Sequence, residues 1–427
     1  MAKKQGLRIL HCGDIYLGRP FPDLPAQSSE RRRGDIKQTL KDLLRYVEEQ
    51  QVHLVLISGN LFDFDYVSYE NVSWVMREME RMSFARFMIA PGVSDKLDKQ
   101  CFYSVCQLPK NVHVFSEKPE IVKLPKWKIN VFGWGLSVDQ KDNWPMTKFT
   151  PDEGETYLVC GCLGAGGKEG VRVSEEEIAS SGVVYMALSG DEGFHGFTQV
   201  GNTVVAESGL LESGSFTHLG FGGANLLTLL REGDVDEEIE QESRDLPEQL
   251  PEAEQMTYFE SPEQNEEESD QIAEEEQKPH AEFDVFGGKL VAERLTFGMR
   301  RYVTETLNIS GMTDIEEVEQ AVYDLVRQKG YGEDTSLCVV LEGRISPDFV
   351  PPRLRDHTVH GLAELFSMDK SVPHTEEDYG KDMTVRGELL RAMMPKILNN
   401  DEKTRENAIK ALRIAFLALD NNDPHHI

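Results

Sequence analysis

Five apolar segments of this 427-residue sequence each end in glycine followed by small or acidic residues. The first is LRILHCGDIYLG at residues 7–18, in which Asp14 directly follows the apolar run. The later four are LVLISGNLFD (54–63), FMIAPGVSD (87–95), YLVCGCLG (157–164) and VVYMALSGDEG (183–193). Because α/β folds place their chemistry at the carboxyl ends of their strands, the pattern predicts one polar site where the five strand ends converge.

The stretches between these strands indicate how the site is held. Asp35 has the character of a helix N-cap, and the apolar spacing after it predicts an amphipathic helix to about Gln51; a second helix is predicted near 69–82. Strand and helix alternate here, which implies parallel pairing. Residues 111–137 change to short strands typical of an antiparallel edge and a second sheet. We therefore expect an α/β fold with two mixed β-sheets flanked by helices.

In their order and spacing, the five segments resemble the calcineurin-like metallophosphoesterases, in particular DNA-repair exonuclease subunits of the SbcD and YhaO kind. Members of that family read D-x-H at the first block, G-D at the second and G-N-H-D at the third. A lone His follows on the fourth strand and G-H-x-H at the fifth. The resemblance implies a metallophosphoesterase-type sandwich, in which relatives hold two manganese or similar divalent ions.

This chain keeps the frame of the family and loses most of its metal ligands. Asp14 is kept, and Asp95 matches an acid that supports the site in the family without binding metal. The positions where the family has a metal ligand or a catalytic histidine and this chain has another residue are Tyr16, Asn60, Val93, Ser94, about Gly161, Gly190 and Glu192. The resemblance therefore implies a degenerate active site.

The missing donors decide which chemistry is expected. Two divalent ions need carboxylate and imidazole ligands on both ions and one shared acid, and Val93, Gly161 and Gly190 offer no donor side chain. Ser94 lacks the imidazole that would act on the scissile phosphate or its leaving group. We expect no catalytic residue and no resident metal.

At most, one weakly held hard cation such as magnesium is expected at the residual site. Its oxygen ligands would come from Asp14, Asn60, Asp95 and Glu192. His195 and His218 lie near site loops and are candidate substitute ligands, with an ordinary surface role as the alternative.

Composition indicates a globular protein with a sizeable core, since 39% of the residues are hydrophobic. The sequence has no run of 18 apolar residues, no signal-peptide pattern and no paired CxxC among its six cysteines, so a cytoplasmic, reduced protein without membrane contact is expected. The net charge of −30 favours weak or no autonomous DNA binding. Much of that charge lies between residues 231 and 284, where 22 acids and 3 bases give −19.

These patterns divide the chain into four regions. The expected regions are a metallophosphoesterase-like domain at 1–230, an acidic disordered linker or insertion at 231–284, a capping-like α/β domain at 285–375 and C-terminal helices at 376–427. A helix is predicted at 313–330 with Thr313 as its cap. The acidic segment has alternative roles as a lure for a basic partner or a mimic that excludes DNA from the cleft.

The C-terminal helices are predicted at 384–398 and 402–420. Leu412, Phe416 and Leu419 lie on an apolar stripe of the second helix and are the expected partner-binding residues; packing of the stripe onto the capping domain is the alternative. In the resembling family the nuclease grips a coiled-coil ATPase of the SbcC type with such helices. That resemblance implies an SbcC-like ATPase as partner, with a homodimer also open.

Three functions are compatible with these observations. The first is a catalytically inactive SbcD/YhaO-like subunit that acts as a scaffold or regulator in a DNA-repair-type complex. The second is an active metal-dependent exonuclease or phosphodiesterase with an unusual metal site. The third is a nucleic-acid binder without catalysis, which the net charge of −30 disfavours.

Overall fold

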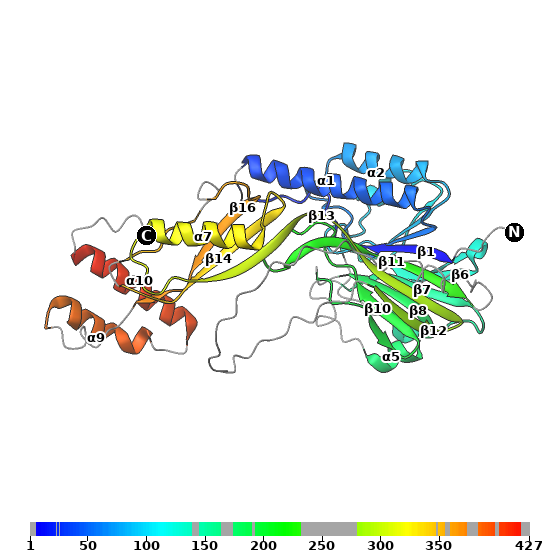
Figure 1. Ribbon diagram of the computed structural model, residues 1–427. Helices are drawn as coiled ribbons and strands as arrows, with labels where there is room; N and C mark the ends of the chain where they lie inside the picture. The colour runs from blue at the N-terminus through cyan, green and yellow to red at the C-terminus, as the bar shows by residue number, and fades with distance from the viewer. Residues whose placement is uncertain are drawn as a thin grey trace, which may run out of the picture. The chain divides into compact units, whose positions relative to one another are not determined.

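A computed structural model of the protein describes residues 6–22, 24, 26–138, 145–163, 174–189, 193–231, 280–346, 349–354, 359–373, 383–397 and 401–419. The chain folds into two compact units (Figure 1). The first comprises Met1–Leu211 and Gly223–Phe297, and the second comprises Glu212–Gly222 and Gly298–Ile427. No helix within the described ranges is long and apolar enough to cross a membrane.

The first unit contains two mixed sheets. In one, the strand order is β13-β11-β1-β2-β3-β4, and β12 pairs with β13. Its strands are β1 (Leu7–Cys12), β2 (Leu54–Ile57), β3 (Arg86–Ile89), β4 (Val112–Val114), β11 (Gly220–Arg231), β12 (His280–Val285) and the first part of β13 (Gly288–Asn308). Strands β1 to β4 are parallel, whereas β11 runs antiparallel to β1 and β12 runs antiparallel to β13.

The second sheet of this unit has the order β5-β6-β7-β8-β10-β9, with parallel pairing from β6 to β10 and antiparallel strands at both edges. Its strands are β5 (Glu120–Leu124), β6 (Ile129–Trp134), β7 (Thr156–Cys162), β8 (Val183–Ser189), β9 (Thr198–Val200) and β10 (Thr203–Glu207). The helical segments of the unit are α1 (Ala26–Glu49), α2 (Tyr69–Arg81), α3 (Phe102–Val105), α5 (Glu175–Ser180), η1 (Pro125–Trp127) and η2 (Pro145–Lys148).

Alternation along the strands builds two apolar layers. Ile9 and Leu56 point into a core that both sheets share, while Leu10 and Val55 point to the other face, which α1 and α2 cover (Figure 1). Both faces of these strands are buried, which explains their nearly continuous apolar sequence. Met146 of η2 and Ile178 of α5 cover the outer face of the second sheet. The expected fold of two mixed sheets flanked by helices is confirmed.

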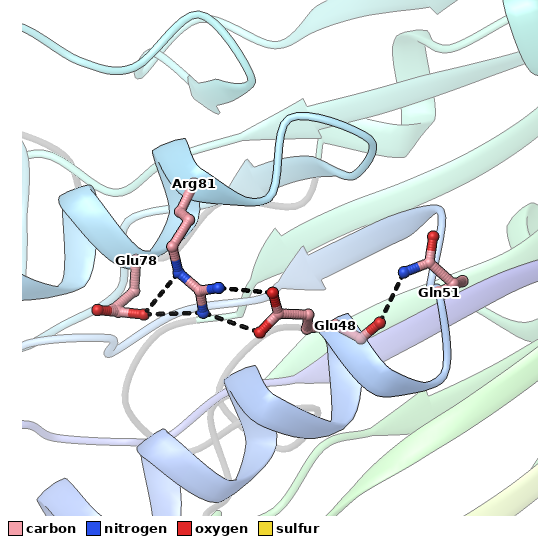
Figure 2. A network of polar contacts seen from close by, with 4 residues as sticks. All are labelled: Glu48, Gln51, Glu78 and Arg81. Atoms are coloured by element: carbon pink, nitrogen blue, oxygen red, sulfur yellow. Dashed lines mark hydrogen bonds and ion pairs between the residues drawn. The ribbon is translucent and has the colours of Figure 1, made fainter.

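Helices α1 and α2 are joined by a polar network at their carboxyl ends. The Arg81 guanidinium donates to both carboxylate oxygens of Glu48, at 2.5 and 2.9 Å, and to Glu78 on its own helix (Figure 2). The predicted cap at Asp35 is wrong, because α1 begins nine residues earlier, at Ala26. Asp35 instead lies inside the helix, where it pairs with buried Arg32 at 3.2 Å.

In the second unit, the rest of β13 pairs in parallel with β14 (Thr335–Glu342), which pairs in parallel with β16 (Glu364–Asp369). Helix α7 (Ile315–Lys329) packs its buried valines on this sheet, and β15 (Arg344–Ile345) pairs with β17 (Val372–Pro373). The predicted cap at Thr313 is off by one residue, because the carboxylate that accepts from the Glu316 amide, at 2.9 Å, belongs to Asp314.

The predicted C-terminal helices are present as α9 (Val385–Ile397) and α10 (Glu402–Leu419), which pack against each other. The structure divides the chain at other residues than the expected regions do. Arg231 ends β11, and β12 begins at His280, inside the predicted acidic linker. Strand β12 and the first part of β13 belong to the first unit, although the capping region was expected to begin at 285. Residues 232–279 lie outside the described ranges.

Candidate functional site

Backbone hydrogen bonds join the loops that follow β1 and β2, and three residues of these loops have left-handed φ values. The amide of Asp14 donates to the Gly59 carbonyl at 3.0 Å, and the amide of Tyr16 donates to the Asn60 carbonyl at 2.8 Å. Asp14, Tyr16 and Asn60 have φ values of 48°, 50° and 54°, in the left-handed region. Asp and Asn tolerate this region, but a bulky side chain there is an outlier, and such strain is typical of present or former functional sites.

The side chains of Asp14 and Asn60 are both buried and touch directly. Asn60 Nδ2 donates to Asp14 Oδ1 at 2.6 Å, while Asn60 Oδ1 accepts from the Ser94 amide at 2.9 Å. The two contacts fix the amide orientation, because only the nitrogen donates and only the oxygen accepts. The side chain at the family's bridging position therefore presents hydrogens, not a lone pair, to Asp14.

Asp95 is buried and ties three segments together. Its carboxylate accepts from the amides of Asn60, Leu61, Phe62 and Gly92, at 2.6 to 3.4 Å, and from the Tyr103 hydroxyl at 2.7 Å. Burial raises the pKa of Asp95, and the hydrogen bonds act in the opposite direction. Five donors use the lone pairs that a metal ion would need, so Asp95 has a structural role.

Strand β7, which contains the fourth of the five apolar segments, presents a cysteine to the site. A methyl group built on Gly59 would lie 3.0 Å from Cys162 Sγ and 2.8 Å from Ser189 Oγ, so Cys162 faces the end of β2. Gly161 faces the opposite way, where a methyl group would come within 2.3 Å of the buried Trp134 ring. The side chain of β7 that faces the site thus belongs to Cys162, the residue after the expected placement at about Gly161. Alternation from Cys160, which points into the shared core, would have given this answer from the sequence.

The end of β8 carries Ser189, whose hydroxyl donates to the Ser58 carbonyl at 2.6 Å. Gly190 and Glu192 lie outside the described residues. His195 is exposed in the first unit, and His218 belongs to the second unit, where its Nδ1 lies 3.0 Å from Thr217 Oγ1.

These contacts test whether the site fits the two-metal centre that the family resemblance implies. Within the described ranges, no three His, Cys, Asp or Glu side chains gather where a metal ion could bind. Asn60 donates where the family has an acceptor, and Asp95 is saturated. Of the expected oxygen ligands that the structure describes, namely Asp14, Asn60 and Asp95, only Asp14 has chemistry that still suits a cation. The site residues within the described ranges do not fit a two-metal centre.

A buried polar network behind the site was not predicted from the sequence. His11 of β1 is fully buried in the shared core, with Nδ1 2.8 Å from the Tyr185 hydroxyl and Nε2 3.0 Å from Ser58 Oγ. Arg294 donates to Asn225 Oδ1 at 2.8 Å and to the Ser208 carbonyl at 2.6 Å. Burial and the nearby Arg294 charge lower the pKa of His11 to about 3. His11 is therefore neutral in the folded protein.

This network makes stability depend on pH. His11 has a lower pKa folded than unfolded, so the unfolded chain binds the extra proton and stability falls as the pH drops below the unfolded value of 6.5. We expect a loss of about 2 kcal/mol from this residue between pH 7 and pH 5. Denaturant titrations at both pH values check this, with His11→Gln as the control that loses this dependence. An equal pH dependence in both proteins would contradict it.

The expected partner surface on α10 needs correction. Leu412 is fully buried against α9, in a cluster with Leu390, Ile397 and Ala408, so it does not lie on an open surface. Leu412 and Ala408 of the stripe pack on α9, a neighbour that neither expected arrangement included. The side chains of Leu419 and Ile414, both on α10, are 43% and 44% exposed. The side chain of Phe416 lies outside the described part of the structure.

The comparison with protein families agrees with the fold of the first unit. Residues 7–174 match the family model for calcineurin-like phosphoesterases, which covers less than half of the chain. No curated protein matches the sequence. The crystal structure of TT1561 of Thermus thermophilus matches with a TM-score of 0.31 and 11% identity, over 48% of this chain and 90% of that chain. A similarity this low carries no argument about function.

Proposed function

We propose that this chain is a catalytically inactive phosphoesterase-type subunit of the SbcD/YhaO kind, which serves as a scaffold or regulator for an SbcC-like ATPase. The observation that carries the proposal is the 2.6 Å hydrogen bond from the Asn60 amide to Asp14. The match of residues 7–174 to calcineurin-like phosphoesterases supplies the family context.

The physical reason lies in the sign of the charge at position 60. In a two-metal site, one acid bridges both ions and neutralises part of their charge. The Asn60 amide is neutral and directs its partly positive NH2 group at Asp14, so a cation there would face a donor instead of a ligand. The hydrogen bond stabilises Asp14 without metal, which turns a catalytic centre into a structural contact.

A nuclease assay tests the catalytic part of the proposal. Given manganese or magnesium, the purified chain should cleave neither linear duplex DNA nor a generic phosphodiester above the background of an Asp14→Ala variant. The expected ratio of the two rates is about one, because the donor set does not activate a water. Metal-dependent turnover that Asp14→Ala abolishes would favour the active single-metal phosphodiesterase instead.

The partner part of the proposal concerns the outer surface of the α9–α10 hairpin. Ile414 and Leu419 of α10 and Val385 of α9 are all more than 40% exposed. Exposed apolar side chains on a helix pair suit a coiled-coil partner, whose apolar seam could cover them. Leu412 belongs to the hairpin core and so supplies a matched control for any test of this surface.

We expect the double variant Ile414→Glu, Leu419→Glu to have a free energy of unfolding within about 0.5 kcal/mol of the wild-type value, because both side chains are exposed. Thermal unfolding measures it. The same variant should lose co-purification with an SbcC-like ATPase. Leu412→Ala should instead cost about 2 kcal/mol of hairpin stability through a core cavity. Retained co-purification of the double variant would remove the hairpin from the proposal.

A further inference from the structure

A groove runs along α2 on the first unit, on the side away from the strand-end site. It encloses about 920 Å³ between α2 and residues 105–111. Val72, Met76 and Leu108 give it an apolar floor. Tyr69 and Val105 stand on its lining with 66% and 63% of their surface exposed. Two large apolar side chains this exposed, beside an apolar floor, are typical of a binding surface.

The charge of the groove is opposite to that of the chain. Arg77, Arg86 and Lys110 line it with Glu80, which gives +3 − 1 = +2 in a protein of net charge −30. Neighbouring Arg81 is paired with both Glu48 and Glu78, and these three side chains together carry one negative charge (Figure 2). Among the described residues, Arg77, Arg86 and Lys110 have no carboxylate within ion-pair distance. The groove therefore suits an acidic peptide with apolar side chains.

We propose that this groove docks the acidic segment 232–279 of the same chain, whose residues lie outside the described ranges. The segment has 20 acids and 2 bases, a charge of −18, and it also contains apolar residues. These are Val235, Ile239, Leu246, Leu250, Ala253, Met256, Tyr258, Phe259, Ile272 and Ala273. Its composition thus complements both the floor and the charge of the groove.

The position of the end of β11, from which the segment 232–279 continues, also supports its docking in the groove. Leu229, near the end of β11, pairs with Leu7 at the start of β1, so the chain leaves at the amino-terminal edge of the parallel strands. The groove lies at that same edge, because Arg86 opens β3 and Asn111 directly precedes β4. Three strand spacings of about 4.8 Å separate β1 from β4.

Reach does not limit this docking. A chain of 48 residues can extend to roughly 150 Å, about ten times the distance across the three strands. Because the occupant is part of the same chain, docking is intramolecular, and modest contacts suffice to populate the docked state. Each exposed ion pair contributes little alone, so the docked state should depend on salt and on several basic residues together.

Hydrogen–deuterium exchange on the full-length chain tests the proposal. The test variant is Arg77→Glu with Lys110→Glu, and the control is Arg31→Glu with Arg33→Glu, the same change in charge on the exposed surface of α1. In the wild type and the control, amides at 105–111 and within 232–279 should be protected together. In the test variant, the ratio of docked to free chain should fall about tenfold, and both regions should exchange faster.

The other outcomes overturn the proposal. Equal exchange at 105–111 in all three proteins would show that Arg77 and Lys110 hold no acidic segment in the groove. Protection of 232–279 that survives the test variant would place the segment elsewhere. Groove protection that rises with protein concentration would identify a second copy of the chain as the occupant. None of these readouts involves phosphodiester cleavage, so the result is independent of the proposed function.

Discussion

Asn60→Asp should destabilise the protein by about 3 kcal/mol at pH 7 without divalent cations, because it replaces a buried hydrogen bond by two buried carboxylates. Asn60 Nδ2 lies 2.6 Å from Asp14 Oδ1, and two ionised oxygens cannot share that distance unless a cation or a proton lies between them. Thermal unfolding with and without manganese measures the effect. Manganese should restore much of the lost stability to the variant and leave the wild type unchanged.

The pH dependence of this variant has a defined sign. Repulsion raises the folded pKa of one carboxyl group above its unfolded value, so the variant should come closest to the wild type near pH 4. The deficit should grow as the pH rises through the folded pKa. Asn60→Gly is the control, since glycine accepts the φ of 54° and adds no carboxylate. A manganese effect as large in Asn60→Gly as in Asn60→Asp would contradict the explanation.

Asp95→Ala should have the largest effect of any substitution at the site, about 5 kcal/mol. The change leaves four backbone amides, those of Asn60, Leu61, Phe62 and Gly92, without their acceptor. Each buried donor without a partner costs about 1–3 kcal/mol, and single substitutions above about 4 kcal/mol are exceptional. Equilibrium denaturation in urea measures the loss.

Two controls separate the contacts of Asp95. Tyr103→Phe removes the one side-chain donor, at 2.7 Å, and should cost only about 2 kcal/mol. Asp95→Asn keeps one carbonyl oxygen and should fall between the other two variants. If Asp95→Ala cost no more than Tyr103→Phe, the four amides would have found other acceptors, and the structural role of Asp95 would be disproved.

Much of the fold could be predicted because the strands are buried on both faces. LRILHC, LVLI and FMI read as parallel strands for that reason, and β1, β2 and β3 follow them closely. The start of α1 could not be predicted from Asp35, because a buried pair with Arg32 uses that acid inside the helix. Local capping patterns do not reveal such tertiary contacts.

The site was predicted more unevenly. The polar strand ends were identified because Asp14, Asn60 and Asp95 each follow an apolar run, and the structure brings the three together. The direction of a side chain was harder to predict, as Cys162 and Gly161 show. Leu412 was misplaced for a related reason, because an apolar stripe on one helix does not state which neighbour covers it.

The five hydrogen bonds of Asp95 have a consequence for how such sequences change over time. They stabilise the strand-end loops whether or not any phosphodiester is cleaved there. Selection for folding alone can therefore keep this acid long after selection for turnover has ended. Genome surveys that count acids in phosphoesterase motifs would then score a silent protein as an enzyme. The residue at position 60 is the more informative one to inspect, because an acid there would bridge two metal ions and would have no structural task without them.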